Sequence, residues 1–303
     1  MKSRSVVSLA VAALLGILPR GSVAQSQAAS SLSFSFTSFD YPGAISTQAL
    51  ATNQNGIAVG YYLDANSAEH GFVRSADGQF KEVDYPGAVG TILLGINDSN
   101  EAVGLYNGTD IFYQGFIFEP PNQFTPIYYG GLASETTPYG INNNGQIVGA
   151  WSGDQIQGGF SLLDGTYTDL LYPNAEFTNP DGVNSAGVIV GSWVSACSPL
   201  CRYHGFMLTS AVGGTYTDVN FPGSVATYID AINDSNEVVG AYGSAAGGYY
   251  QAWVGLPSKN QYATLAYPGA IFTAACGINN ARHIVGYYLD ANNMTHGFLA
   301  VPK

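Results

Sequence analysis

Short apolar runs separated by polar turn residues recur along the chain and predict β-strands. In one stretch the runs are Thr91 to Asn97, Glu101 to Tyr106, Gln114 to Phe118 and Gln123 to Tyr128. Clusters of Gly, Asn, Asp and Pro lie between them, as is typical of strands joined by tight turns. We name the four strands of such a unit a, b, c and d. No segment requires a helix, so the pattern predicts an all-β protein.

The units are copies of one another. The recurring order is Tyr-Pro-Gly-Ala, Thr, Gly-Ile-Asn, Val-Gly, an aromatic residue and His-Gly-Phe, and six copies, some of them degenerate, occur between residues 34 and 303. The first element begins at Tyr41, Tyr85, Tyr128 (as Tyr-Tyr-Gly-Gly), Tyr172, Phe221 and Tyr267, and the Asn of Gly-Ile-Asn is Asn53, Asn97, Asn142, Asn184, Asn233 and Asn279. Spacings of 43 to 49 residues with four strands per unit are typical of propeller blades.

The two ends of the repeat region complement each other. Residues 34–41 form a d-type strand with no a, b or c strand before it, and residues 296–301 form a c-type strand with no d strand after it. Pairing these segments would supply the missing strand and protect sheet edges from aggregation. The sequence therefore predicts a six-bladed β-propeller of four-stranded blades, closed by residues 34–41 pairing with residues 296–301.

These motifs resemble the HAF repeat of bacterial extracellular proteins, whose units carry Gly-Ile-Asn, Val-Gly and a His-(Ala/Gly)-Phe triplet. The resemblance covers residues 34–303, and the triplets centred on Gly71, Gly205 and Gly297 match it best. Those centred on Gly115, Gly159 and Ala252 depart from it. The resemblance implies a secreted repeat protein and carries over no catalytic residue.

The first 24 residues have the layout of a secretory signal. A basic start is followed by an apolar stretch from Val6 to Leu18 and by Ser22-Val23-Ala24, which favours cleavage after Ala24. The stretch is shorter than the roughly 20 residues that span a bilayer. We therefore expect residues 25–33 to form a short linker and residues 34–303 a single propeller domain. The expected location is extracellular or periplasmic, with no membrane insertion after cleavage.

Composition and charge limit the classes of partner that the protein can bind. The chain has 38 Gly, 21 Tyr and 15 Phe, which favours strands and turns. Without residues 1–24 it has 6 basic and 21 acidic residues, so it lacks the Lys/Arg surface that nucleic-acid binding requires. We expect a monomer that recognises a glycan or an extracellular protein, with no nucleic-acid partner.

Histidines and acids are the candidates for chemistry, but most occupy repeated positions. His70, His204 and His296 share one slot and would lie on different blades, so hydrogen bonding at the start of a strand is the favoured role. The acids near the ends of d strands, Asp40, Asp84, Asp169 and Asp218, are expected to bond backbone N–H groups locally. No metal-ligand spacing, cofactor motif or catalytic motif is present, so we expect no catalytic residue, no metal and no cofactor.

Three cysteines remain after export. Cys197 and Cys201 lie in the one elongated b-to-c connection, and an oxidising compartment favours a disulfide between them. The alternative is a free dithiol. Cys276 precedes Gly277-Ile278-Asn279 on an a strand and is most simply a buried apolar residue.

The variable d-to-a and b-to-c loops should emerge on one face, where rigid scaffolds commonly place recognition. The favoured ligand contacts there are Trp151, Trp193, Tyr249 and Tyr250, because aromatic rings with a polar edge suit sugars and peptides. Packing between blades is the competing role for both Trp.

Two functional hypotheses follow. The first is a secreted, non-enzymatic binding or scaffold module that uses this loop face. The second is a secreted hydrolase or lyase at the mouth of the central channel, which would need unrepeated acids such as Glu135, Asp230 or Glu176 to converge. A purely structural role in an extracellular layer is a third hypothesis.

Overall fold

The computed structural model describes residues 32–108, 113–131, 133–153, 156–195, 202–244 and 250–303. This part of the chain forms 24 β-strands and one 3₁₀ turn, η1 (Pro257–Lys259), which confirms the all-β prediction. None of its helical segments is long and apolar enough to cross a bilayer. The proposed signal segment, residues 1–24, lies outside the described residues.

Four sheets each contain four consecutive strands, paired antiparallel in chain order. They are repeat 2, with β6 (Gly90–Ile96), β7 (Ala102–Asn107), β8 (Tyr113–Glu119) and β9 (Gln123–Ile127); repeat 3, with β10 (Glu135–Ile141), β11 (Ile147–Ser152), β12 (Gln157–Leu163) and β13 (Thr166–Leu170); repeat 4, with β14 (Phe177–Val183), β15 (Ile189–Val194), β16 (Tyr203–Leu208) and β17 (Tyr216–Asp218); and repeat 5, with β18 (Ser224–Ile232), β19 (Val238–Ser244), β20 (Gln251–Leu256) and β21 (Gln261–Leu265).

The other eight strands form one mixed sheet. It contains repeat 1, with β2 (Ser46–Thr52), β3 (Ala58–Leu63), β4 (Glu69–Arg74) and β5 (Phe80–Glu82), and repeat 6, with β22 (Phe272–Ile278), β23 (Ile284–Leu289), β24 (Thr295–Pro302) and the N-terminal β1 (Phe34–Phe39). The two halves are joined by a single parallel pair, Ser46 opposite Thr295.

The first and last strands of the described chain lie side by side. β1 pairs antiparallel with β24, from Phe34 opposite Pro302 to Phe39 opposite Gly297, as the sequence predicted. The strand ends at Phe39 rather than Tyr41 because residues 41–44 form the next turn, in which the Ala44 N–H donates to the Tyr41 carbonyl at 3.1 Å.

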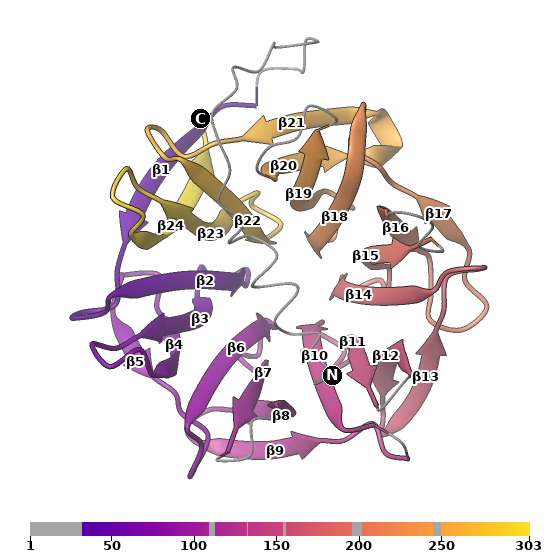
Figure 1. Ribbon diagram of the computed structural model, residues 1–303, viewed down its shortest axis with the longest axis horizontal. Coiled ribbons are helices and arrows are strands. Elements are labelled where there is room, and N and C mark those ends of the chain that lie inside the picture. Colours follow the sequence, from indigo (N-terminus) through magenta and orange to yellow (C-terminus); the bar gives the residue numbers. More distant parts are fainter. Residues whose placement is uncertain (1–31, 109–112, 132, 154–155, 196–201, 245–249) are drawn as a thin grey trace, which may run out of the picture.

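The repeats are arranged around a common centre (Figure 1). The first strand of each repeat is innermost, namely β2, β6, β10, β14, β18 and β22. Apolar clusters lie between neighbouring repeats; Val239 of repeat 5, for example, shares a cluster with Ile284 and Phe298 of repeat 6. Burial between sheets thus holds the arrangement together.

The Val-Gly element of each repeat is explained by close contact between strands a and b. A Cβ added to Gly286 would lie 1.9 Å from the carbonyl oxygen of Ala274, and one added to Gly60 would lie 1.9 Å from that of Gln48. The equivalent distances at Gly104, Gly149, Gly191 and Gly240 are 2.0 to 2.2 Å. Only glycine fits this position.

Aromatic rings stack where strand b meets the end of strand d. The pairs are Tyr41–Tyr62, Tyr85–Tyr106, Tyr129–Trp151, Tyr172–Trp193, Phe221–Tyr242 and Tyr267–Tyr288, with centroids 3.7 to 4.7 Å apart. The sequence assignment of Tyr128 to this slot is wrong. Tyr129 occupies it, and its N–H donates to Thr136 Oγ1 as the equivalent residues do to their Thr. The extra residue of this repeat lies between Tyr129 and Thr136, which are 7 positions apart where Tyr85 and Thr91 are 6 apart. Tyr128 is 57% exposed.

Candidate functional site

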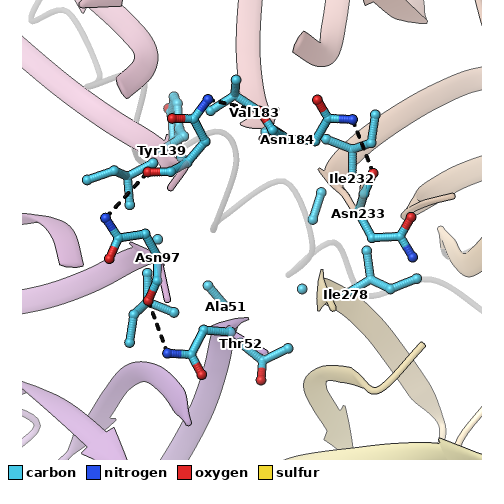
Figure 2. Close-up of a pocket in the computed structure, with 18 of the residues that line it drawn as sticks. Ala51, Thr52, Asn97, Tyr139, Val183, Asn184, Ile232, Asn233 and Ile278 are labelled. Atoms are coloured by element: carbon cyan, nitrogen blue, oxygen red, sulfur yellow. Dashed lines mark hydrogen bonds between the residues drawn. The ribbon is translucent and has the colours of Figure 1, made fainter. Parts of the chain in front are cut away.

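Six asparagines, one from each a-to-b turn, form a closed cycle of hydrogen bonds around the centre, part of which is drawn in Figure 2. The Nδ2 of each donates to the backbone carbonyl oxygen of the next: Asn53 to Asn97, Asn97 to Asn142, Asn142 to Asn184, Asn184 to Asn233, Asn233 to Asn279, and Asn279 to Asn53, at 2.9 to 3.4 Å. All six are buried. The third residue after each Asn closes the turn and has a positive φ in every repeat, including 61° at Arg282.

Strand a of every repeat contains a β-bulge three residues before this Asn. The bulged residues are Leu50, Leu94, Tyr139, Asp181, Asp230 and Cys276. A bulge adds one residue to a strand and re-aims its side chain. All six bulged residues line one central cavity, so the bulge places a variable side chain there in each repeat.

The residue after each bulge is Gly or Ala because neighbouring repeats are in contact there. A Cβ on Gly140 would lie 2.9 Å from the carbonyl oxygen of Asp181, and one on Gly277 would lie 2.8 Å from Cα of Ala51. The six bulges are thereby held close together at one level.

The cavity has a volume of about 100 Å³. It extends from the bulges past the asparagine cycle to the residues that follow each Asn, which are Gln54, Asp98, Asn143, Ser185, Asp234 and Asn280. The cavity therefore lies at the a-to-b turn end of the strands. Its size suits a small ligand rather than an extended one.

The six bulged residues surround the cavity; those on one side, which we call the polar arc, have polar side chains, and those on the opposite side are apolar. Tyr139, Asp181 and Asp230 come from the consecutive repeats 3, 4 and 5. Leu50 and Leu94 come from repeats 1 and 2 and pack against apolar neighbours. A ligand at the centre would meet hydrogen-bonding groups on one side and hydrocarbon on the other.

The two carboxyl groups are difficult to ionise. Burial raises the pKa of Asp230 to about 7. Burial, together with the charge of Asp230, raises the pKa of Asp181 well above its ordinary value. Removal from water penalises the charged form, and a second nearby acid adds to the penalty.

One oxygen of this arc lacks a partner among the described residues. The Tyr139 hydroxyl is buried without a hydrogen bond and lines the cavity. Beside the arc, Asn179 donates from Nδ2 to Asp181 Oδ1, while its own Oδ1 has no partner among these residues. Buried polar atoms usually have partners, so the Tyr139 hydroxyl marks a place where a ligand or water would complete the bonding.

Only some of the residues that line this cavity were predicted from the sequence. Asp230 lines the cavity, but Glu135 and Glu176 do not, so the three acids do not converge there. Glu135 instead accepts a hydrogen bond from Ser152 Oγ at 3.1 Å. Asp181 and Tyr139 were missed, although both occupy the slot before the Gly of Gly-Ile-Asn. Cys276, expected to be a simple buried residue, is a free thiol that lines the cavity.

The aromatic contacts predicted on the loop face lie at the opposite end of the strands. Trp193 stacks between Tyr172 and His204, at 4.3 and 4.6 Å, and donates from Nε1 to Asp218. Trp151 stacks on Tyr129, and its Nε1 is buried without a partner. Tyr250 packs edge-on against Tyr228. Tyr249, Cys197 and Cys201 lie outside the described residues.

Two of the repeated histidines lie within hydrogen-bonding distance of an aspartate near the end of the neighbouring d strand. His70 Nδ1 lies 2.7 Å from Asp84 Oδ2, and His296 Nδ1 lies 2.9 Å from Asp40 Oδ2. Asp84 also accepts a bond from the Gly71 N–H, which is the local role expected of it.

Comparison with known proteins identifies the fold. Neither a protein-family model nor a curated protein matches the chain. TolB from Acinetobacter baumannii has a TM-score of 0.56 at 10% identity over 81% of this chain, which spans 63% of TolB. A gluconolactonase from Xanthomonas campestris has a TM-score of 0.52 at 9% identity, with 86% of this chain and 88% of that chain covered. A lectin from Aleuria aurantia, solved with Fucα1-6GlcNAc, has a TM-score of 0.51 at 9% identity, covering 84% and 91%.

These similarities place the chain among the β-propellers. At this level of identity they define the fold alone. The HAF resemblance is consistent with a propeller, but no family model supports the family itself.

Proposed function

We propose that this protein is an exported, non-enzymatic binding module built as a single six-bladed propeller, residues 34–303, after a signal peptide at 1–24 and a linker at 25–33. Six equivalent bulges, the closed asparagine cycle and the β1–β24 pairing support six blades and closure of the ring. The eight-stranded sheet is then two blades joined by the pair Ser46–Thr295.

The ligand site is the central cavity, and the observation that carries it is the polar arc of Tyr139, Asp181 and Asp230 facing Leu50 and Leu94. The arc includes the Tyr139 hydroxyl, which has no hydrogen-bond partner among the described residues. A small ligand rich in hydroxyl groups, with an apolar C–H face, fits both halves. The terminal sugar of a glycan has this chemistry.

Binding is favoured over catalysis by the environment of the two acids. An acid/base pair works when its two pKa values are pushed apart. Here burial raises the pKa of both Asp181 and Asp230, and the charge of Asp230 raises that of Asp181 further, so neither acid has a lowered pKa that would keep it ionised as a base. A carboxyl group that keeps its proton can both donate and accept hydrogen bonds with a hydroxyl-rich ligand.

A glycan array followed by titration calorimetry with the sugar that binds tests this function. Asp181→Asn with Asp230→Asn should lower affinity at least about tenfold, which is one lost hydrogen-bonded contact of 1.4 kcal/mol. Trp151→Ala with Trp193→Ala, checked for folding by thermal melting, should leave affinity unchanged. The reverse result would place the ligand on the loop face, and no glycan binding at all would overturn the proposal.

The alternative is a hydrolase or lyase at the same cavity, favoured by the proximity of Asp181 and Asp230. Mass spectrometry of the bound sugar after long incubation separates the two functions. An unchanged mass is expected, and a product that disappears in Asp230→Asn would establish the alternative.

A further inference from the structure

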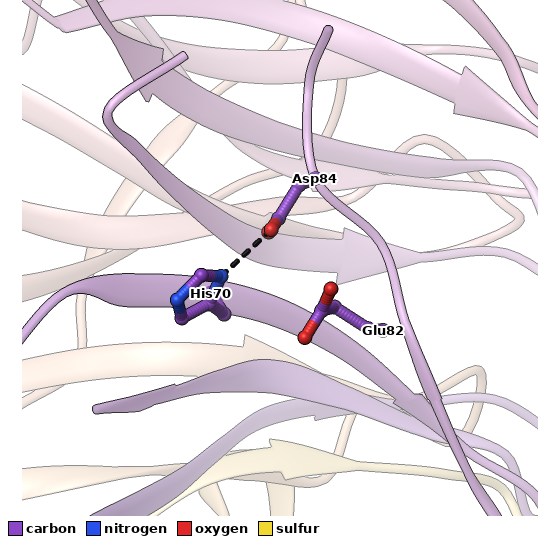
Figure 3. A group of neighbouring side chains, drawn as sticks. All are labelled: His70, Glu82 and Asp84. Carbon is purple, nitrogen blue, oxygen red and sulfur yellow. Dashed lines mark hydrogen bonds and ion pairs between the residues drawn. The ribbon is translucent and has the colours of Figure 1, made fainter. Parts of the chain in front are cut away.

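A second cluster of chemically active side chains lies on the outer part of repeat 1, away from the channel. One ligand-type atom each from His70 (β4), Glu82 (β5) and Asp84 lies within 4.8 Å of the others (Figure 3). His70 Nδ1 and Asp84 Oδ2 are 2.7 Å apart, so the imidazole nitrogen already points at a carboxylate. One imidazole and two carboxylates are a ligand set that binds borderline divalent cations.

The cluster carries more negative charge than its surroundings neutralise. A further carboxylate, Asp64, lies 4.0 Å from His70 Nε2, on the other side of the ring. In the described part of the chain, no Lys or Arg forms an ion pair with any of these acids. The nearest basic residue in sequence, Lys81, instead donates to the carbonyl oxygen of Pro121 at 2.8 Å.

Repeat 6 contains a nearly identical cluster that lacks one carboxylate. His296 Nδ1 lies 2.9 Å from Asp40 and Nε2 lies 3.9 Å from Asp290, as in repeat 1. The position of Glu82 is occupied by Ser38, since Glu82 is paired with Phe72 and Ser38 with Phe298.

The two positions also make the same hydrogen bond. Glu82 accepts from the Tyr62 hydroxyl, and Ser38 bonds the Tyr288 hydroxyl at 3.0 Å. Those tyrosines pack on His70 and His296 in the same way. The hydrogen bonds and packing that a structural role would need are therefore present without Glu82.

Repeat 4 differs at the other carboxylate. His204 is there, Asp218 is paired with Phe206 as Glu82 is with Phe72, but Asn220 takes the place of Asp84 and accepts from the Gly205 N–H. Among the described residues, only repeat 1 combines the imidazole with both carboxylates.

We propose that His70, Glu82 and Asp84 form a binding site for a borderline divalent cation such as Zn²⁺, with Nδ1 of His70 and one oxygen of each carboxylate as ligands. Water would fill the remaining positions of a tetrahedral shell. Ca²⁺ should bind more weakly, because it prefers six to eight oxygen ligands. This site is independent of the channel and of its ligand.

Titration calorimetry with ZnCl₂ at fixed pH tests the site. The full chain carrying Cys197→Ser and Cys201→Ser serves as the background, so that thiols of the loop add no zinc site. One equivalent of Zn²⁺ is expected. Glu82→Gln, which keeps an acceptor for the Tyr62 hydroxyl, should weaken it at least about tenfold, while Asp40→Asn in repeat 6 should leave it unchanged.

The matched gain-of-site variant is Ser38→Glu, which gives repeat 6 the carboxylate it lacks. It should raise the stoichiometry from one Zn²⁺ to two per chain, with thermal melting used to confirm folding of each variant. No zinc binding by the background chain, zinc binding that survives Glu82→Gln, or no second equivalent in Ser38→Glu would each overturn the assignment.

Discussion

The side-chain amide of Asn279 donates to the backbone carbonyl oxygen of Asn53 at 3.0 Å, although the residues are 226 positions apart. This bond completes a cycle that runs through all six repeats, so the last repeat is tied to the first at the centre of the molecule. The pairing of β1 with β24 joins the ends of the described chain at the periphery.

Asn279→Ala should lower the free energy of unfolding by about 1–3 kcal/mol, because it removes one of the two bonds to the buried Asn53 carbonyl and leaves the His283 N–H without its partner. Urea unfolding measures the change. The exposed neighbour is the control: Asn280→Ala removes two surface bonds, both to Asp234, and should cost less than about 1 kcal/mol. Equal losses would contradict a structural role for the cycle.

Gly286→Ala should cost about 3 kcal/mol or more, because the added Cβ would lie 1.9 Å from the Ala274 carbonyl oxygen and strand a would have to move. Gly269→Ala is the comparison, since nothing lies within 4 Å of its added Cβ and only its φ of 81° opposes the change. That substitution should cost about 1–2 kcal/mol. Denaturant unfolding of both variants is the measurement.

Arg282 shows how a disfavoured backbone conformation is compensated. Its φ is 61°, where the other repeats have Gly or Asn, but its guanidinium pairs with the buried carboxylate of Glu237. Arg282→Gly should therefore destabilise the protein, because a buried charge loses its partner. In a Glu237→Gln background the same change should stabilise by about 0.5–1 kcal/mol through relief of the positive φ. The same sign in both backgrounds would rule out this compensation.

The raised pKa values of Asp181 and Asp230 predict that stability falls as pH rises. The folded protein holds protons on these groups at pH values where the unfolded chain, with Asp near 3.9, has lost them. Stability should therefore decline from about pH 4 to pH 7, where Asp230 titrates.

Asp230→Asn should consequently raise Tm more at pH 8 than at pH 4.5, by about 2–4 °C for each kcal/mol recovered. A gain in Tm that is the same at both pH values would exclude titration of Asp230 as its cause.

Much of the fold could be predicted from the repeat itself, because the turn and glycine positions recur at a fixed spacing. The Asn of Gly-Ile-Asn and the pairing of the two ends follow from this periodicity. The prediction failed at the degenerate Tyr-Tyr-Gly-Gly element, where the second tyrosine, Tyr129, and not Tyr128, occupies the stacking position.

The cavity could not be predicted in the same way. A bulge leaves no distinct sequence mark, and without it regular alternation does not identify Asp181 as a cavity residue. The variable position before Gly-Ile-Asn was visible in the sequence, however: Leu50, Leu94, Tyr139, Asp181, Asp230 and Cys276 are four residue types at one repeat position. Comparing this slot across the repeats would have found the site.

A crystal structure of the protein with the sugar identified on the glycan array tests most directly whether the central cavity is the ligand site. The account predicts sugar density in the central cavity, with hydroxyl groups within hydrogen-bonding distance of Asp181 and Asp230 and C–H groups against Leu50 or Leu94. Sugar density at Trp151 and Trp193 instead, with only water between the two carboxyl groups, would contradict it.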